Sequence, residues 1–239
     1  MKKIYVVMPA YNASKTIESV FKRIPKATLK KIRRFIIVND GSSDKTESII
    51  KNLNKTFKIK VVNHNPNKGY GAAQKSGFKE ALRQGADIAV LLHSDGQYAP
   101  EVMDKLLLPL ENGTADVVQG SRILGGSALK GKMPLYKYFG NIFLTFIENI
   151  AYGMDMAEYH SGYMLYSKKA LMTIPFEKLS DKFHFDGEML LVSRKKGLNT
   201  KEIPIPTRYA DEKSHLNPIT YGLEVLKTII NYWRGKYDF

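Results

Sequence analysis

The sequence predicts an α/β protein with a mostly parallel central sheet that is flanked by helices. Three observations predict this class. Through residues 1–120, short apolar runs alternate with helical patterns of about ten residues, as in successive β-α-β units. Several of these runs are continuously apolar, which is typical of strands buried on both faces of a parallel sheet. The 239 residues are 44% hydrophobic and 25% charged, which is sufficient for one large domain with a core.

Five strands and four helices, joined by right-handed crossovers, are expected in the first half of the chain. The expected strands are Ile4–Met8, Arg34–Asn39, Lys58–Asn63, Ile88–Leu92 and Asp116–Gln119. The expected helices are Ser14–Arg23, Lys45–Leu53, Ala72–Gln84 and Pro100–Leu110. Asn12 or Ser14 can cap the first helix and Asp44 the second, because their side-chain oxygens accept free backbone N–H groups. Gly85 ends the third helix, and Pro100 begins the fourth.

The alternation stops after Gly120, and the second half is less regular. Residues 125–131 are expected to form a loop. The elements expected after it are an apolar helix at Pro134–Tyr152, a strand at Tyr163–Tyr166, a helix at Phe185–Lys196, an edge strand at Glu202–Pro206 and a helix at 218–233. Pro204 and Pro206 place that last strand at an edge, because proline cannot donate to a neighbouring strand. The final helix has an apolar face, which is formed by Leu223, Leu226, Ile230 and Trp233.

Composition excludes several kinds of protein. The chain has no cysteine, which excludes disulfides, zinc–thiolate sites and thiol nucleophiles and fits a cytoplasmic protein. The apolar segment Ile4–Met8 is too short for a signal peptide and is interpreted as a core strand. No segment has the roughly 18 apolar residues of a membrane span, and the nearest candidate, Tyr138–Tyr152, is interrupted by Asn141, Glu148 and Asn149. This helix either lies at a membrane interface or covers the core with its apolar face.

The net charge of +14, from 37 lysines and arginines against 23 acidic residues, suggests a polyanionic partner. Nucleic acid, an anionic membrane surface and phosphorylated substrates all have this chemistry. The cations are scattered over many expected helices, so that lysine-rich solvated surfaces are the alternative. The sequence has no recognisable nucleic-acid recognition motif, and nucleic acid is therefore not an expected partner.

The end of the fourth expected strand carries the first candidate site. His93, Ser94, Asp95, Gly96 and Gln97 follow the apolar run directly. In open α/β sheets, ligands bind outside the carboxyl ends of the strands. Asp95 and Gln97 can therefore offer oxygen ligands to a hard divalent cation, which would neutralise a nucleotide diphosphate. Taken alone, this segment is also compatible with a strand end and a polar turn.

Two further loops follow neighbouring strand ends. Tyr11 can stack on a base, and Asp40 can accept hydrogen bonds from a base or a ribose. A plain turn with a helix cap is the alternative for the segment around Asp40. The loop Asn65–Gly71 leads into a helix, where glycines would allow the backbone to approach a ligand and the helix amino terminus favours negative charge. Lys68 and Gly69 of this loop are candidate nucleotide contacts.

Six motifs occur in the order and approximate spacing of one known family. They are Met8-Pro-Ala-Tyr-Asn, Val38-Asn-Asp-Gly-Ser-Ser-Asp-Lys-Thr, Asn67-Lys-Gly-Tyr-Gly, His93-Ser-Asp-Gly-Gln-Tyr, Gly120-Ser-Arg and Ile203-Pro-Ile-Pro-Thr-Arg. Each motif is weak alone, but together the chain from residue 3 to about 215 resembles family 2 glycosyltransferases, and more narrowly their dolichyl-phosphate mannose synthase-like branch. The resemblance implies a single-domain GT-A fold. Residues 1–120 would form a nucleotide-sugar-binding half, residues 121–215 an acceptor-side half, and residues 216–239 a C-terminal amphipathic helix.

The resemblance also implies a reaction. Enzymes of this branch transfer a sugar with inversion from a UDP- or GDP-hexose to a polyprenyl or dolichyl phosphate, with Mg²⁺ or Mn²⁺. The residues that match the family's motifs are Pro9, Tyr11, Asn12, Asp40, Lys68 and Gly69 for the nucleotide, Asp95 and Gln97 for the metal and diphosphate, and Arg122, Arg208 and Lys213 for the phosphates. Arginine, lysine and a cation can stabilise the charge that develops on a leaving diphosphate. A lipid phosphate is already ionised near pH 7, so its transfer needs positioning rather than a strong general base.

Two positions depart from the family pattern. Ala13 stands where the family usually has glutamate, which removes a nucleoside contact. His93 replaces the first aspartate of Asp-x-Asp, and a neutral imidazole can bind Mn²⁺ but suits Mg²⁺ poorly. Either Asp95 carries the metal with Gln97, or His93 joins the ligands and metal dependence is altered. A histidine that is merely hydrogen-bonded at a strand end is the alternative.

The acceptor side leaves more than one function open. Asp186 and Glu188 resemble residues that border the acceptor site, and either can be a general base if the acceptor is a hydroxyl group of a saccharide in cell-surface glycan synthesis. Alternatively, both position loops or pair with arginine. The expected protein acts at the cytoplasmic membrane face, through its basic surface and apolar helices or through a membrane partner subunit. A non-catalytic nucleotide-sugar-binding subunit is a further alternative, because of His93 and Ala13.

Overall fold

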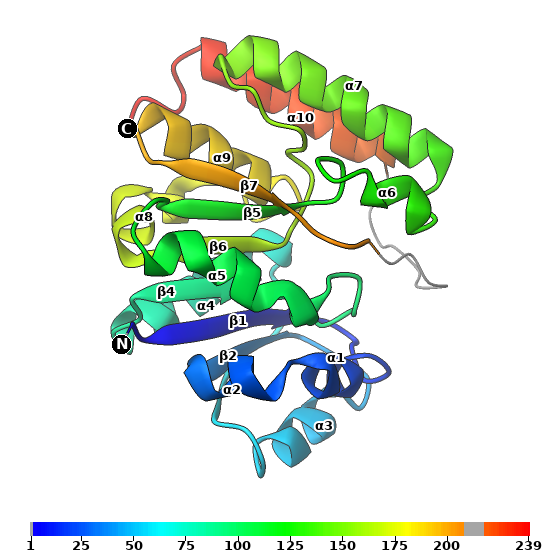
Figure 1. Ribbon diagram of the computed structural model, residues 1–239, viewed down its shortest axis with the longest axis vertical. Coiled ribbons are helices and arrows are strands. Elements are labelled where there is room, and N and C mark those ends of the chain that lie inside the picture. The colour runs from blue at the N-terminus through cyan, green and yellow to red at the C-terminus, as the bar shows by residue number, and fades with distance from the viewer. Residues whose placement is uncertain (1, 208–217) are drawn as a thin grey trace.

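The computed structural model in Figure 1 describes residues 2–207 and 218–239 and is built on one seven-stranded sheet. The strands are β1 (Ile4–Ala10), β2 (Ile32–Asp40), β3 (Ile59–His64), β4 (Ile88–Leu91), β5 (Val117–Ser121), β6 (Met164–Ser167) and β7 (Thr200–Pro204). Their order across the sheet is β3-β2-β1-β4-β6-β5-β7. Of the described strands, only β6 pairs antiparallel with its neighbours. The predicted mostly parallel sheet is therefore confirmed, and β7 lies at its edge as expected.

The helices also follow the predicted order, with some differences. The α-helices are α1 (Ile17–Arg23), α2 (Lys26–Lys31), α3 (Thr46–Leu53), α4 (Tyr70–Arg83), α5 (Met103–Glu111), α6 (Ser127–Lys130), α7 (Leu135–Tyr152), α8 (Lys168–Thr173), α9 (Phe185–Lys195) and α10 (Pro218–Trp233). Two 3₁₀ helices are η1 (Pro100–Val102) and η2 (Phe176–Lys178). The sequence did not predict α2, α6 and α8, because helices of four to six residues are too short to show a helical period.

The two predicted helix caps had different outcomes. The N-cap of α3 is Lys45 rather than the expected Asp44, although the Asp44 carboxylate does accept the backbone N–H of Thr46, the first residue of α3, at 2.9 Å. The expected cap of α1 by Asn12 or Ser14 is wrong, because α1 begins only at Ile17. Both residues instead lie in a loop whose backbone is held by the segment that follows β2.

Two apolar clusters cover the two faces of the sheet. Successive residues of β1 point to opposite faces, so that Val7 belongs to one cluster and Val6 to the other. The cluster around Val7 contains residues of α4, α8 and α9, and the cluster around Val6 contains residues of α1, α3 and α5. This two-sided burial explains the continuously apolar runs in the sequence.

Helices α7 and α10 lie side by side over the half of the sheet that contains β5 and β7 (Figure 1). Val225 and Ile229 of α10 are buried in the core, but most of the large apolar residues of both helices point outward. On α7 these are Leu135, Tyr136, Phe139, Ile142, Phe143, Phe146 and Ile150, and on α10 they are Ile219, Leu223, Leu226, Ile230 and Trp233, all at least 39% exposed. The buried residues of α7 are mostly polar: Asn141, Thr145, Glu148 and Tyr152. We call the twelve exposed residues the apolar face.

This orientation bears on the two interpretations of the apolar helix. The inner side of α7 does cover the core, since Leu144, Ile147 and Ala151 pack against it. The larger apolar stripe points outward, where it is free to lie at a membrane interface, and that interpretation stays a prediction. Within the described part of the chain, no helix combines the length and apolar character that a bilayer span requires.

The packing of α4 on the sheet gives a stability test. A methyl group at Gly77 would lie 2.2 Å from Cγ1 of Val7, whereas nothing lies within 4 Å of the corresponding position at Gly140 in α7. We expect Gly77→Ala to lower the free energy of unfolding by about 1–3 kcal/mol, because the helix must move off the sheet. We expect Gly140→Ala to raise it by up to about 1 kcal/mol, because alanine favours the helix. Urea unfolding of both variants measures this, and equal effects would contradict the packing described.

Candidate active site

The loops after β1 and β2 meet at the carboxyl edge of the sheet, as the sequence predicts. The side-chain oxygen of Asn12 accepts the backbone N–H of Ser43 at 2.9 Å. The backbone N–H of Asn12 donates to Ser42 Oγ at 3.0 Å. Asn12 has φ +50°, a left-handed conformation that asparagine tolerates better than most residues. The joined loops place Tyr11 at the surface with 46% exposure, where its ring can meet a flat ligand.

Asp40 has an internal role that the sequence did not predict. It is buried at the end of β2, and its Oδ1 accepts hydrogen bonds from His64 Nδ1 at 2.6 Å and from Lys68 N at 2.9 Å. Its Oδ2 accepts the N–H of Gly69 at 3.0 Å. The carboxylate therefore holds the loop before α4 through the N–H groups that were expected to receive a ligand's negative charge. A contact of Asp40 with the nucleoside stays a prediction.

Gly69 and Gly71, at the start of α4, lie against another loop of the chain. A Cβ at Gly71 would lie 2.5 Å from the carbonyl oxygen of Ser180, and one at Gly69 would lie 2.8 Å from that of Asp181. The N–H of Gly71 also donates to the Asp181 carbonyl at 2.8 Å. These glycines thus admit the chain's own loop at 180–181. Ligand contacts of Lys68 and Gly69 stay predictions.

In the segment after β4, partly exposed polar residues alternate with buried residues. His93, Asp95 and Gln97 are half-buried, whereas the residues between them are buried. The Asp95 Oδ1 accepts the N–H of Gln97 at 3.0 Å, and its Oδ2 lies 3.8 Å from His93 Nδ1. The Ser94 hydroxyl donates to the carbonyl of Pro9 at 2.8 Å, which ties this segment to the loop after β1.

Asp95 is suited to bind a cation. Desolvation raises the pKa of its carboxyl group, but a protonated His93 and the backbone N–H of Gln97 together lower it by more, so that the pKa lies below its ordinary value. The group is therefore ionised at neutral pH, and 42% of its side chain is exposed. In the described part of the chain, no three His, Asp or Glu side chains are grouped to hold a metal ion. A cation at Asp95 would need ligands from a bound diphosphate or from water.

Asp186 and Glu188 are not placed as free bases. Asp186 is buried, and burial raises its pKa; its oxygens accept hydrogen bonds from Tyr70 Oη at 2.7 Å and Gln74 Nε2 at 3.0 Å. Glu188 is also buried and accepts the N–H of Ser180 and the hydroxyl of Tyr237, both at 2.6 Å. These contacts favour the alternative that both residues position loops.

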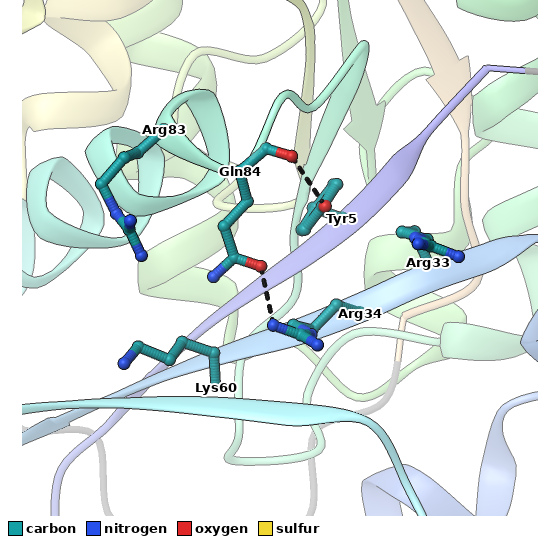
Figure 2. Close-up of a pocket in the computed structure, with 6 residues that line it drawn as sticks. All are labelled: Tyr5, Arg33, Arg34, Lys60, Arg83 and Gln84. Carbon is teal, nitrogen blue, oxygen red and sulfur yellow. Dashed lines mark hydrogen bonds between the residues drawn. The ribbon is translucent and has the colours of Figure 1, made fainter.

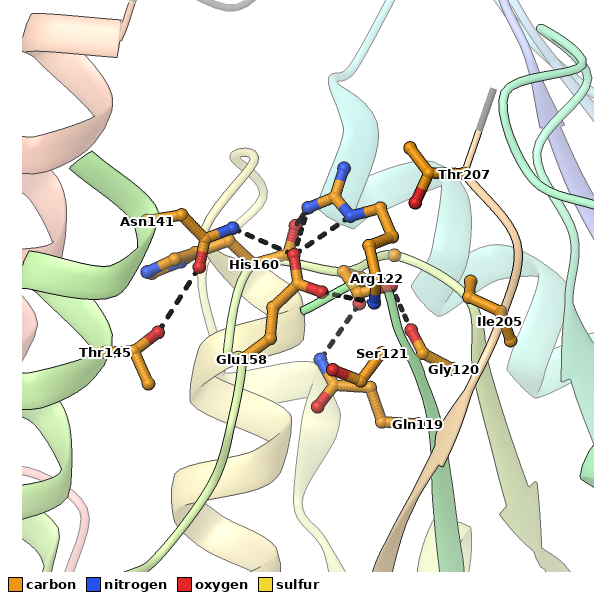
Figure 3. Close-up of polar contacts among 12 residues, drawn as sticks. Gln119, Gly120, Ser121, Arg122, Asn141, Thr145, Glu158, His160, Ile205 and Thr207 are labelled. Atoms are coloured by element: carbon orange, nitrogen blue, oxygen red, sulfur yellow. Dashed lines mark hydrogen bonds and ion pairs between the residues drawn. The ribbon is translucent and has the colours of Figure 1, made fainter. Parts of the chain in front are cut away.

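Arg122 follows β5 and lies in a buried polar network, which Figure 3 shows. Its guanidinium donates to Glu158 and to the carbonyl of His160, and its backbone N–H donates to Glu158 Oε2 at 2.7 Å. Asn141 of α7 donates to Glu158 Oε1 at 2.8 Å. Burial raises the pKa of Glu158, but Arg122 lowers it by more, so that the pair is charged. A phosphate contact of Arg122 stays a prediction, and Arg208 and Lys213 lie outside the described residues.

A separate cationic pocket of about 430 Å³ lies near the amino-terminal ends of the strands, away from the carboxyl ends where the candidate site lies. Figure 2 shows its lining. The lining residues are Tyr5, Arg33, Arg34, Lys60, Arg83 and Gln84. They come from the amino-terminal parts of β1, β2 and β3 and from the end of α4, so that this pocket is distinct from the predicted site.

The sequence profile of glycosyl transferase family 2 matches residues 5–174, which include the loops after β1, β2, β4 and β5. The chain belongs to this family. It has the GT-A fold that the sequence motifs predicted.

Relatives of this glycosyltransferase act on lipid phosphates, as their names state. It is 35% identical to the UDP-N-acetylglucosamine–dolichyl-phosphate N-acetylglucosaminyltransferase of Methanococcus voltae, over 88% of this chain and 87% of that protein. It is 28% identical to the dolichol-phosphate mannosyltransferase of Pyrococcus furiosus, over 99% of this chain and 66% of that protein. Among solved structures, it resembles the glucosyl-3-phosphoglycerate synthase of Mycobacterium tuberculosis in complex with Mn²⁺, UDP-glucose and phosphoglyceric acid. The TM-score is 0.70 with 19% identity, over 96% of this chain and 79% of that one.

Sequence reasoning missed Tyr70 and Glu158 in the glycosyltransferase. Tyr70 was only one letter of a motif, although its hydroxyl lies 2.7 Å from His93 Nε2. Glu158 is completely buried, and a buried carboxylate has no signal in a single sequence until its partner, here Arg122, is known.

The pair of Arg122 and Glu158 gives a test that depends on pH. We expect Glu158→Gln to lower the free energy of unfolding at pH 7 by about 3 kcal/mol, because it leaves a buried guanidinium without its counter-charge. Glutamate in an unfolded chain titrates near pH 4.3, and the folded pKa is lower, so that the carboxylate's contribution is fully present above about pH 4.3. It is lost as the pH falls through the lower folded pKa, so that the difference from the unmodified protein shrinks there. Urea unfolding of both proteins at pH 7 and again well below about pH 4.3 measures this difference.

The matched control is Glu18→Gln, which removes an exposed partner of Lys22. It should change stability little at either pH, because exposed ion pairs contribute little. A similar loss in both variants would contradict the assignment.

Proposed function

We propose that this protein transfers a sugar, with inversion, from a UDP- or GDP-hexose to a polyprenyl or dolichyl phosphate at the cytoplasmic face of a membrane. The observation that carries the proposal is the position of α7. The inner face of α7 touches the candidate site, because Asn141 donates to the Glu158 that binds Arg122. The outer side of the same helix carries the apolar face. A long apolar acceptor could thus lie along one side of the helix while its phosphate reaches the other.

The donor lies, in this proposal, across the carboxyl edge of the sheet. Tyr11 stacks on the base, and the loops that hold Pro9, Asn12 and Asp40 border the nucleoside, with Lys68 and Gly69 beside it. Asp95 and Gln97 face the diphosphate. A bound Mg²⁺ or Mn²⁺ would neutralise the charge of the leaving diphosphate.

The reaction needs no protein base, and this agrees with the site. A phosphate monoester carries about −1.5 to −2 charges at pH 7, so that its oxygen is already a nucleophile. Asp186 and Glu188, the residues proposed as bases for a hydroxyl acceptor, are buried and engaged in hydrogen bonds. Catalysis then depends on positioning and on stabilising the leaving diphosphate, to which Arg122, Arg208 and Lys213 are proposed to contribute.

The surroundings of the apolar face favour an anionic membrane as its partner. The exposed cations nearest in sequence are Lys130, Lys132, Lys227, Arg234 and Lys236. The carboxylates of α7 and α10 do not oppose this contact, since Glu148 is buried and Glu224 is paired with Lys182 and His184. An apolar surface edged by cations suits the boundary between lipid tails and anionic headgroups.

The transferase activity is tested with a panel of UDP- and GDP-hexoses, polyprenyl phosphate and either Mg²⁺ or Mn²⁺. We expect lipid-linked sugar from one donor, and we expect Asp95→Ala to lower turnover by about 100-fold or more, because it removes a charged group from the diphosphate site. Asp87→Ala is the matched control, since Asp87 precedes β4 at the amino end of the strand, where its carboxylate accepts the backbone N–H of Lys3 at 2.7 Å. Nucleotide binding without turnover of any donor would contradict the proposal.

Membrane binding is tested by co-sedimentation with vesicles that contain anionic lipid. We expect Phe139→Ser, Phe143→Ser and Phe146→Ser together to weaken binding by more than tenfold, because each buried phenylalanine contributes about 1.5–3 kcal/mol. Added salt should weaken the binding that remains in the triple variant, because it screens the attraction between the protein's cations and the anionic lipid. Met172→Ser, at an equally exposed residue of α8, is the control. Equal binding by the triple variant and the control would contradict a membrane contact at the apolar face.

A further inference from the structure

A chain of three polar side chains ends at the candidate metal site. The hydroxyl of Tyr70 in α4 donates to Asp186 Oδ2 at 2.7 Å and lies 2.7 Å from His93 Nε2. Gln74, one turn further along α4, donates to Asp186 Oδ1 at 3.0 Å. The reaction proposed above uses neither Tyr70 nor Asp186, although both are held in close hydrogen bonds beside the site.

When Asp186 is ionised, the hydrogen bonds of Tyr70 define which nitrogen of a neutral His93 ring carries the proton. A tyrosine hydroxyl has one hydrogen, and here it is donated to Asp186. The oxygen of Tyr70 must then accept its second hydrogen bond from an N–H at His93 Nε2. The lone pair of a neutral His93 ring is consequently on Nδ1, which lies 3.8 Å from Asp95 Oδ2.

The ring of His93 is also held in place sterically. A Cβ at residue 162 would lie 2.5 Å from His93 Nε2, so that glycine is needed there for the ring to fit. The ring of Tyr98 meets that of His93 edge-on, with their centroids 4.8 Å apart. The imidazole therefore has a defined orientation as well as a defined tautomer.

We propose that Tyr70 and Asp186 are positioning residues that present His93 Nδ1, beside Asp95, as a ligand of a divalent cation and so favour Mn²⁺ over Mg²⁺. This rests on the proposed function, which places a cation at Asp95. Two ligand atoms that are each about 2.1 Å from one ion lie between about 3 and 4.2 Å apart, and the 3.8 Å between Nδ1 and Oδ2 falls within that range. Imidazole nitrogen is a good ligand for transition metals, whereas Mg²⁺ prefers oxygen.

The first measurement is made on the unmodified protein. Long-range ¹H–¹⁵N correlations of the histidine rings distinguish the two neutral tautomers, and we expect His93 to carry its proton on Nε2. Paramagnetic resonance of free Mn²⁺, with UDP or GDP present, then gives the Mn²⁺ affinity, and competition with Mg²⁺ gives the preference.

The variants separate the ligand from the residues that position it. We expect His93→Asp to lower the ratio of Mn²⁺ to Mg²⁺ affinity by about tenfold, because it replaces nitrogen by oxygen. We expect Tyr70→Phe and Asp186→Asn each to weaken Mn²⁺ binding by about tenfold, as loss of a group that orients a ligand does. Tyr5→Phe is the matched control, since its hydroxyl donates to the Gln84 carbonyl at the opposite edge of the sheet.

Two results would overturn the inference while leaving the proposed function intact. One is a proton on His93 Nδ1. The other is that Tyr70→Phe has the Mn²⁺ affinity of Tyr5→Phe and that His93→Asp has its ratio of Mn²⁺ to Mg²⁺ affinity. Failure of the unmodified protein to bind Mn²⁺ with either nucleotide would instead overturn this inference together with the metal dependence of the proposed reaction.

Discussion

The ion pair between Arg122 and Glu158 joins the end of β5 in the central sheet to the segment that follows α7. Arg122 follows β5, and Glu158 lies in the segment between α7 and β6. Both are buried, so that each charge depends on the other for its solvation. The backbone N–H of Glu158 is in turn accepted by Glu202 of β7 at 3.0 Å. The end of β5, the edge strand β7 and the inner face of α7 thus meet at one carboxylate.

The same ion pair explains why α7 turns its apolar side outward. The inner face of α7 must satisfy buried polar groups, and Asn141 does so at Glu158 while Glu148 lies 3.2 Å from His160 Nε2. Because polar residues occupy much of the inner face, most of the large apolar residues of the helix lie at the surface. A contiguous exposed apolar surface is typical of an interaction site. The buried polar contacts of α7 therefore help to account for the apolar face.

The sequence predicted the fold because its signals are local. Strands such as β1 and β4 are continuous apolar runs, and α4 and α9 are long enough to show a helical period. It also predicted that Asp95 follows the end of β4. It could not predict which face of α7 points inward, because an amphipathic pattern defines a stripe and not its partner. Nor could it assign Gly71 or Asp186, since their partners Asp181 and Tyr70 lie more than a hundred residues away in sequence.

The charges at the site fit the transfer of a sugar to a phosphate. Replacing the first aspartate of the family motif by His93 removes one negative charge from the place where a diphosphate and an acceptor phosphate would meet. Glu158 already neutralises Arg122, which therefore adds a directional donor rather than a net positive charge. A site with fewer carboxylates tolerates two phosphorylated substrates with less repulsion, because like charges at short range in a partly buried site repel strongly. A second carboxylate at position 93 would add a ligand for a cation, but it would also add a negative charge beside two phosphorylated substrates.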